Sequence, residues 1–109
     1  DIIKVGAHRV GAKEIEDVLH EHPGVLEAAV VAAPHDLLGE APLAFVALRE
    51  PPADAERVLR GFCAARLAAH KVPVRIVVQP ELPKLAGAGK IDKRSLRQRA
   101  RDGLNALTG

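Results

Sequence analysis

Two glycines stand just before a lysine in the segment GAGKIDK, residues 87–93. Gly87 and Gly89 lack a side chain beyond hydrogen, so the backbone around them is adaptable and of low bulk. The ammonium group of Lys90 can therefore reach deep into a partner's cleft without steric obstruction. A compact cation carried in this way is suited to a negatively charged group. The segment predicts chemistry on an anionic substrate, or simple binding of an anion.

Rigid anchors flank this loop on both sides. Pro83 restricts the backbone where the loop begins, and Asp92 is of the type that caps a helix, so a helix is expected directly after it. A P-loop is excluded by spacing, because Lys84 and Ile91 stand where that motif requires Gly and Ser or Thr. The structural alternative is a solvated surface turn, since Gly and Lys are common in loops.

Composition indicates one compact domain, residues 1–109, with 48% hydrophobic and 28% charged residues. Phe45 and Phe62 are its two aromatic residues, so the core must be aliphatic and an RNA-stacking surface is not expected. Sixteen basic and fourteen acidic residues give a net charge of +2, which does not indicate nucleic acid. The local basic excess in residues 84–101 is expected to be a solvated helix face.

Cys63 is the single cysteine, so an internal disulfide is excluded. Its side chain is expected to be a small buried hydrophobic group, which fits a reducing cytoplasm. Neither a signal peptide nor an apolar run of transmembrane length is found, so a cytoplasmic location is expected. The start at Asp1, without Met, predicts a fragment of a longer chain. His20 and His22 would point to different faces of a helix, so no metal site is expected.

Hydrophobic periodicity predicts an α+β fold. The expected elements are a hairpin at residues 2–10, a helix at 11–22, paired strands at 25–33 and 41–49, a helix at 54–70, a strand at 74–78 and a basic helix at 95–107. The first of the paired strands is expected to close at Pro34. The result would be a small central, mostly antiparallel three-stranded sheet with packed helices and an N-terminal β-hairpin.

Two separated motifs resemble one known family. Residues 1–10, DIIKVGAHRV, followed by EIE at 14–16, resemble the segment that opens the C-terminal domain of adenylate-forming enzymes, the acyl-CoA synthetases and their relatives. LPK at 82–84 with GKID at 89–92 resembles the motif that closes that domain. The intervening sequence is similar to the family pattern as well, so the resemblance covers essentially the whole chain.

The resemblance implies a two-step ligase, in which a carboxylic acid and ATP give an acyl-adenylate and pyrophosphate, and a thiol, usually coenzyme A, then takes the acyl group. Lys90 matches the adenylation lysine, whose ammonium would bridge the attacking carboxylate and the α-phosphate. ATP with Mg²⁺, and coenzyme A, would bind mainly with a large N-terminal domain of the same chain. The small domain would rotate on a hinge expected just before Asp1, and alone it would be inactive.

The resemblance also assigns a thioester-forming face. Gly6, Ala7, His8 and Arg9 match the hairpin that lines the pantetheine tunnel. The guanidinium of Arg9 is a natural phosphate clamp, and its structural alternative is a salt bridge within the hairpin or with Glu14. A lone histidine such as His8 is more often a surface residue than a base.

The sequence departs from the family pattern in two places. Ala7 stands where the opening motif usually has Gly, with Gly6 displaced by one, which would alter the pantetheine passage. The closing loop is one residue longer than the family pattern between Pro83 and Lys90, and Leu85 stands where Thr is common. Both differences would change how the Lys90 side chain reaches the substrate. The acid, and the choice between coenzyme A and a carrier-protein thiol, stay open. The alternative function is a free-standing phosphate-binding or protein-interaction module without catalysis.

Overall fold

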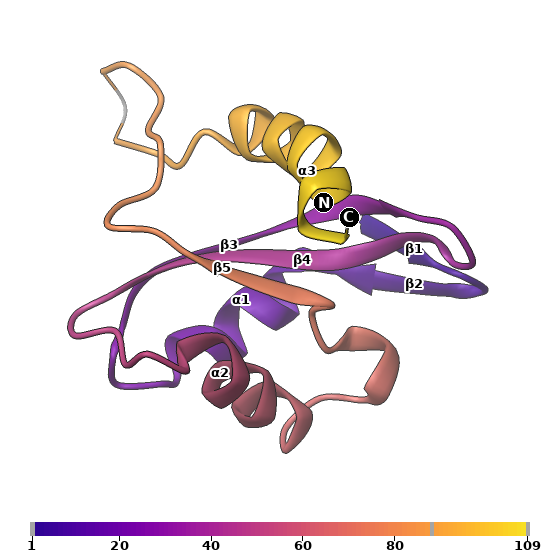
Figure 1. The fold of residues 1–109 in the computed structure, drawn as a ribbon, viewed down its shortest axis with the longest axis horizontal. Helices are drawn as coiled ribbons and strands as arrows, with labels where there is room; N and C mark the ends of the chain where they lie inside the picture. The colour runs from indigo at the N-terminus through magenta and orange to yellow at the C-terminus, as the bar shows by residue number, and fades with distance from the viewer. Residues whose placement is uncertain (1, 88, 109) are drawn as a thin grey trace.

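The computed structural model describes residues 2–87 and 89–108, with side chains described as far as Gly103. The strands are β1 Ile2–Val5, β2 His8–Gly11, β3 Val25–His35, β4 Gly39–Leu48 and β5 Arg75–Val78. The helices are α1 Ala12–His20, α2 Ala55–Ala64 and α3 Lys93–Thr108, with a 3₁₀ turn, η1, at Ala69–Lys71. Figure 1 shows α1 and α2 on one face of the sheet and α3 on the other. The predicted α+β fold class is confirmed.

One sheet contains all five strands, in the order β2-β1-β4-β3, with β5 beside β4. The β3–β4 ladder is antiparallel and β5 runs parallel to β4. The N-terminal hairpin forms as expected and extends this sheet, because β1 meets β4 where Val5 lies opposite Gly39. The Gly6 N–H also donates to the Leu38 carbonyl at 2.9 Å. The expected three strands and separate hairpin are therefore one continuous sheet of five strands.

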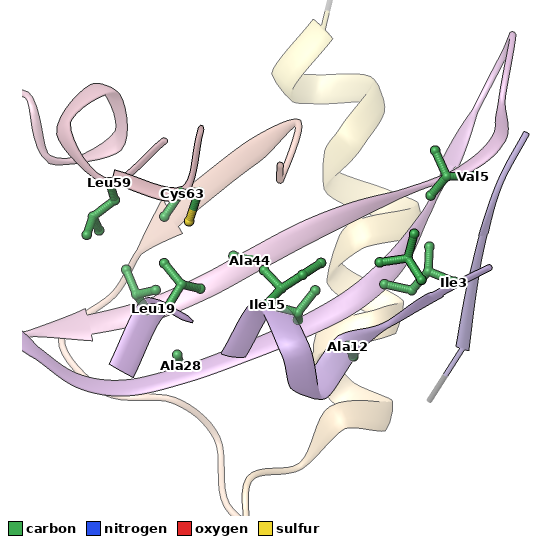
Figure 2. Close-up of a cluster of buried hydrophobic side chains, with 13 residues drawn as sticks. Ile3, Val5, Ala12, Ile15, Leu19, Ala28, Ala44, Leu59 and Cys63 are labelled. Atoms are coloured by element: carbon green, nitrogen blue, oxygen red, sulfur yellow. The ribbon is translucent and has the colours of Figure 1, made fainter. Parts of the chain in front are cut away.

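The sheet is apolar on both faces, which explains the near-continuous apolar runs in the sequence. Figure 2 shows the cluster beneath α1 and α2, where Ile15, Leu19 and Leu59 are fully buried against Ala44. A second cluster lies beneath α3, and its members include Leu43, Phe45, Leu82, Leu96 and Ala100. Each helical layer therefore has its own core, and the sheet separates the two.

Two element boundaries differ from the sequence prediction. β3 does not close at Pro34 but continues to His35, because β3 is an edge strand where a missing N–H costs no ladder bond. The helix expected over 54–70 ends at Ala64. There the Arg66 N–H bonds to the Cys63 carbonyl three residues back, a tightened last turn that ends the helix. Within the described part of the chain, none of the helices has the length and apolar character needed to cross a bilayer.

Candidate functional site

The loop that carries Lys90 is closed at its base by backbone pairing. Lys84 and Ile91 form an antiparallel β-bridge, and the Leu85 N–H donates to the Lys90 carbonyl at 2.7 Å. Outside the bridge, the Asp92 N–H donates to the Pro83 carbonyl at 2.8 Å. The main chain of Lys90 is thus held in a short ladder, while the residue itself is exposed.

The two glycines of this loop adopt a conformation that other residues avoid. Gly87 has φ +78° and Gly89 has φ +69°, both in the left-handed region. A Cβ added at either position would meet nothing within 4 Å. The glycines are therefore required for the backbone turn and not for space around it.

Helix α3 begins directly after the loop with the predicted cap. The Asp92 Oδ1 accepts a hydrogen bond from the Ser95 N–H at 3.2 Å, which satisfies one of the unpaired donors of the first turn. Ile91 packs against the core cluster beneath α3, beside the buried Leu82 and Leu96. The loop is therefore anchored to the domain through both its ends.

A cavity of about 460 Å³ lies beside the loop, and Lys84, Lys90 and Lys93 contribute to its wall together with Glu27 and His20. The Lys84 ammonium forms an ion pair with Glu27 at 2.5 Å. Its hydrogen bond lowers the pKa of the Glu27 carboxyl, against the raising effect of partial burial, and the Leu82 N–H lowers it further. The Glu27 carboxylate is therefore charged at neutral pH and balances the positive charge of Lys84.

The turn of the N-terminal hairpin borders a second cavity, of about 370 Å³. Gly6 makes the turn with φ +59°, and Ala7 and His8 line the cavity. The His8 ring stacks on His70 from η1, with centroids 3.9 Å apart and planes 17° from parallel. His8 is thus not an isolated surface residue, and its partner His70 was not signalled by any motif in the sequence.

Arg9 does not form the salt bridge considered as its structural alternative. The Glu14 carboxylate pairs with Lys71 Nζ at 3.0 Å instead. In the β1–β2 ladder Arg9 lies opposite Lys4, and no ion pair of Arg9 occurs among the described residues. Its guanidinium is exposed beside the hairpin turn and is available to an external anion.

The structure does not bring the two predicted sites together. Figure 1 shows the Lys90 loop at the upper left and the hairpin turn at the right, at opposite ends of the molecule. The two sites are two separate faces.

The remaining candidates for chemistry have structural roles. His22 Nδ1 accepts from the Gly24 N–H at 3.1 Å, and its ring meets the edge of Phe62. Among residues 2–87 and 89–108, no group of three or more His, Cys, Asp or Glu side chains could hold a metal ion. Cys63 is buried, and burial raises the pKa of its thiol to about 11, so it is protonated and unreactive at neutral pH.

Comparison with known proteins identifies the family. The profile of the AMP-binding enzyme C-terminal domain matches residues 14–90. The chain belongs to this family. This match confirms the resemblance to the C-terminal domain of adenylate-forming enzymes that the opening and closing motifs indicated.

Known relatives match nearly the whole of this AMP-binding enzyme C-terminal domain. Human acetyl-coenzyme A synthetase 2-like, mitochondrial, is 40% identical over 101 residues, covering 90% of this chain and 14% of the relative. Pyochelin synthase PchD of Pseudomonas aeruginosa is 44% identical over 106 residues, covering 97% of this chain and 19% of the relative. The structure of apo MatB from Rhodopseudomonas palustris matches with a TM-score of 0.86 and 31% identity, covering 94% of this chain and 20% of MatB. The chain thus spans a fifth or less of the length of these relatives.

Proposed function

We propose that this chain is the mobile C-terminal domain of an ATP-dependent acid–CoA ligase and that it supplies Lys90 to the adenylation step. The observation that carries the proposal is the Lys90 loop, whose base is closed by backbone pairing while its lysine is exposed. A lysine presented in this way is suited to a site completed by another domain. The large N-terminal domain of the same chain would supply the acid pocket and most contacts to ATP and Mg²⁺.

In the adenylation step the acid's carboxylate oxygen attacks the α-phosphorus of ATP, and the bond to pyrophosphate breaks. Two anions approach each other in this step, so their repulsion opposes it. The Lys90 ammonium would lie between the carboxylate and the α-phosphate and stabilise the negative charge of the transition state.

The thioester step would use the hairpin turn at the opposite end of the domain. The thiol sulfur attacks the acyl carbonyl, AMP leaves and the thiol proton is released. The small residues Gly6 and Ala7 would leave room for the pantetheine arm, and the exposed Arg9 would hold a phosphate of coenzyme A. A carrier-protein phosphopantetheine presents the same arm and is the alternative thiol.

The separation of the two faces supports alternation of the domain between the two steps. The loop that carries Lys90 and the turn of the N-terminal hairpin lie at opposite ends of the molecule, so reorientation of the domain would bring each in turn to one active site. The isolated domain would then be inactive, because each face needs the large domain. The cytoplasm, where Cys63 would stay reduced, is the proposed location.

The experiment that tests this function is Lys90→Ala in the full-length enzyme, with two separate assays. Acid-dependent ATP–pyrophosphate exchange reports adenylation, and thioester formation from supplied acyl-adenylate reports the second step. Loss of exchange with survival of thioester formation is expected. Lys13→Ala is the control, since Lys13 is an exposed lysine of α1 that pairs with Asp17. Unchanged exchange in Lys90→Ala would contradict the proposal and favour a phosphate-binding or protein-interaction module.

A further inference from the structure

Two carboxylates bind the two ends of the Lys90 loop. We call residues 85–90 the lysine loop, residues 82–84 its first leg and residues 91–93 its second leg. Glu27 of β3 contacts the first leg, and Glu16 of α1 contacts the second. Glu16 is the last residue of the EIE segment in the opening motif, whereas Glu27 belongs to neither motif, and both are more than fifty residues away in sequence from the leg that they contact.

The first leg is held by a closed set of three contacts. Glu27 Oε1 accepts from the Leu82 N–H at 3.1 Å, and Glu27 Oε2 pairs with Lys84 Nζ at 2.5 Å. Lys84 Nζ also donates to the Leu82 carbonyl at 2.8 Å. The side chains of Glu27 and Lys84 are only 25% and 30% exposed, so water screens the pair less than it screens a surface pair. The leg is therefore fixed to β3 by both main chain and side chain.

The second leg is held in a similar way. Glu16 Oε2 pairs with Lys93 Nζ at 2.7 Å and accepts from the Val30 N–H at 2.9 Å. These side chains are 18% and 26% exposed. Glu16 thus connects the start of α3 to the edge of β3, the same strand that carries Glu27.

The described residues of the lysine loop are exposed, and these legs attach the loop to the domain. Leu85, Gly87, Gly89 and Lys90 are all exposed, and the two legs meet only through the bridge and hydrogen bonds at the loop base. A change in the tilt of either leg therefore moves the lysine. Misplacement of a catalytic group by about 1 Å costs up to about a hundredfold in rate.

We propose that Glu27, assisted by Glu16, is a positioning residue that sets the direction in which Lys90 leaves the domain. The inference rests on the proposed function of Lys90 in adenylation. Glu27 does not touch the substrate. It acts through Lys84 and the loop base, so its loss impairs adenylation and leaves the thioester face unaffected.

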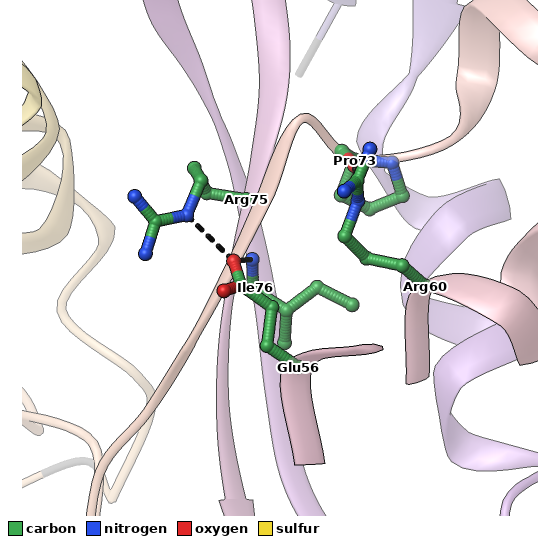
Figure 3. A network of polar contacts seen from close by, with 5 residues as sticks. All are labelled: Glu56, Arg60, Pro73, Arg75 and Ile76. Atoms are coloured by element: carbon green, nitrogen blue, oxygen red, sulfur yellow. Dashed lines mark hydrogen bonds and ion pairs between the residues drawn. The ribbon is translucent and has the colours of Figure 1, made fainter. Parts of the chain in front are cut away.

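The chain contains a matched control for this test. Figure 3 shows Glu56 of α2, whose Oε2 accepts from Arg75 Nε at 2.6 Å and from the Ile76 N–H at 2.9 Å. This is the same arrangement of one carboxylate, one basic side chain and one backbone N–H. It joins α2 to β5 and makes no contact with either leg of the lysine loop. Glu56→Gln therefore removes a comparable tie at a place where Lys90 is not affected.

The experiment compares Glu27→Gln, Glu56→Gln and Lys90→Ala in the full-length enzyme. Glu27→Gln should lower the kcat of ATP–pyrophosphate exchange on the order of tenfold, with little change in the KM for acid or ATP. Thioester formation from supplied acyl-adenylate should stay at the wild-type rate. Glu56→Gln should leave both rates unchanged, even where it lowers the melting temperature as much as Glu27→Gln does.

A double-mutant cycle adds a second measurement that a general loss of stability would not reproduce. Lys84→Gln should lower exchange as Glu27→Gln does, and the double variant should be no slower than either single one. Additive losses, or equal losses in Glu27→Gln and Glu56→Gln, would overturn the positioning role. Loss of thioester formation along with exchange would overturn it as well. Unchanged exchange in Lys90→Ala would instead overturn the proposed function, and the positioning role with it.

Discussion

The imidazole rings of His8 and His70 stack with their centroids 3.9 Å apart, and this contact joins the turn of the N-terminal hairpin to η1. Both rings line the cavity of about 370 Å³ beside Gly6 and Ala7. The neighbouring Lys71 is tied to Glu14 of α1 by an ion pair. The hairpin turn of the proposed thioester face thus packs against η1, a segment more than sixty residues away in sequence.

His70 makes the stability of the domain depend on pH. Partial burial lowers the pKa of His70 below its usual value of 6.5, and the charges of His8 and Lys71 lower it further, while Glu14 opposes them. The unfolded chain therefore binds more protons than the folded one at pH values just below 6.5. The free energy of unfolding should fall as the pH drops from about 7.5 to about 5.5.

The measurement is urea unfolding of the domain at several pH values in this window, with His70→Gln compared to wild type. The variant should show a flatter dependence on pH. An unchanged slope in His70→Gln would assign the dependence to other groups.

The buried thiol predicts slow chemical modification. Burial raises the pKa of Cys63 to about 11, and the side chain lies between α2 and the sheet in the first core cluster. The thiolate fraction at pH 7.5 is therefore very small and reagent access is blocked. Labelling with a thiol reagent should be slow in the native protein and fast in urea. Rapid labelling without denaturant would show that α2 opens more often than this packing implies.

The sequence predicted the elements better than the contacts between them. Apolar runs and the Asp92 cap follow from local rules, so the sheet, the helices and the start of α3 could be predicted. The contact of Glu27 with Lys84 and the stack of His8 on His70 could not. Their partners are more than fifty residues apart, and a lone Glu or His in a sequence gives no information about what will lie opposite it. The end of α2 at Ala64 was missed because the apolar spacing continues to Leu67, which packs on the core from outside the helix.

Glycine substitutions should have opposite effects in the lysine loop and in α2. Gly87→Ala places a Cβ at φ +78°, which should destabilise the domain by about 1 kcal/mol and shift the loop. Gly61→Ala lies within α2, where a Cβ meets nothing within 4 Å, and should stabilise by roughly 0.5 to 1 kcal/mol. Chemical denaturation measures both. In the full-length enzyme only Gly87→Ala should slow ATP–pyrophosphate exchange, and equal exchange rates would show that the turn does not set the reach of Lys90.

The contact between Glu27 and Lys84 also predicts part of the acid sensitivity of the domain. The hydrogen bond from Lys84 lowers the pKa of Glu27 below its usual value of 4.5 in the folded state. The stabilisation from this carboxylate is therefore present in full above about pH 4.5 and is lost as the pH falls through the lower, folded value. Glu27→Gln should be less stable than wild type at pH 7, and this difference should shrink toward pH 3. The comparison requires denaturation curves for both proteins at several pH values. A difference that stays constant from pH 7 to pH 3 would mean that Glu27 stabilises the first leg by packing and not by its charge.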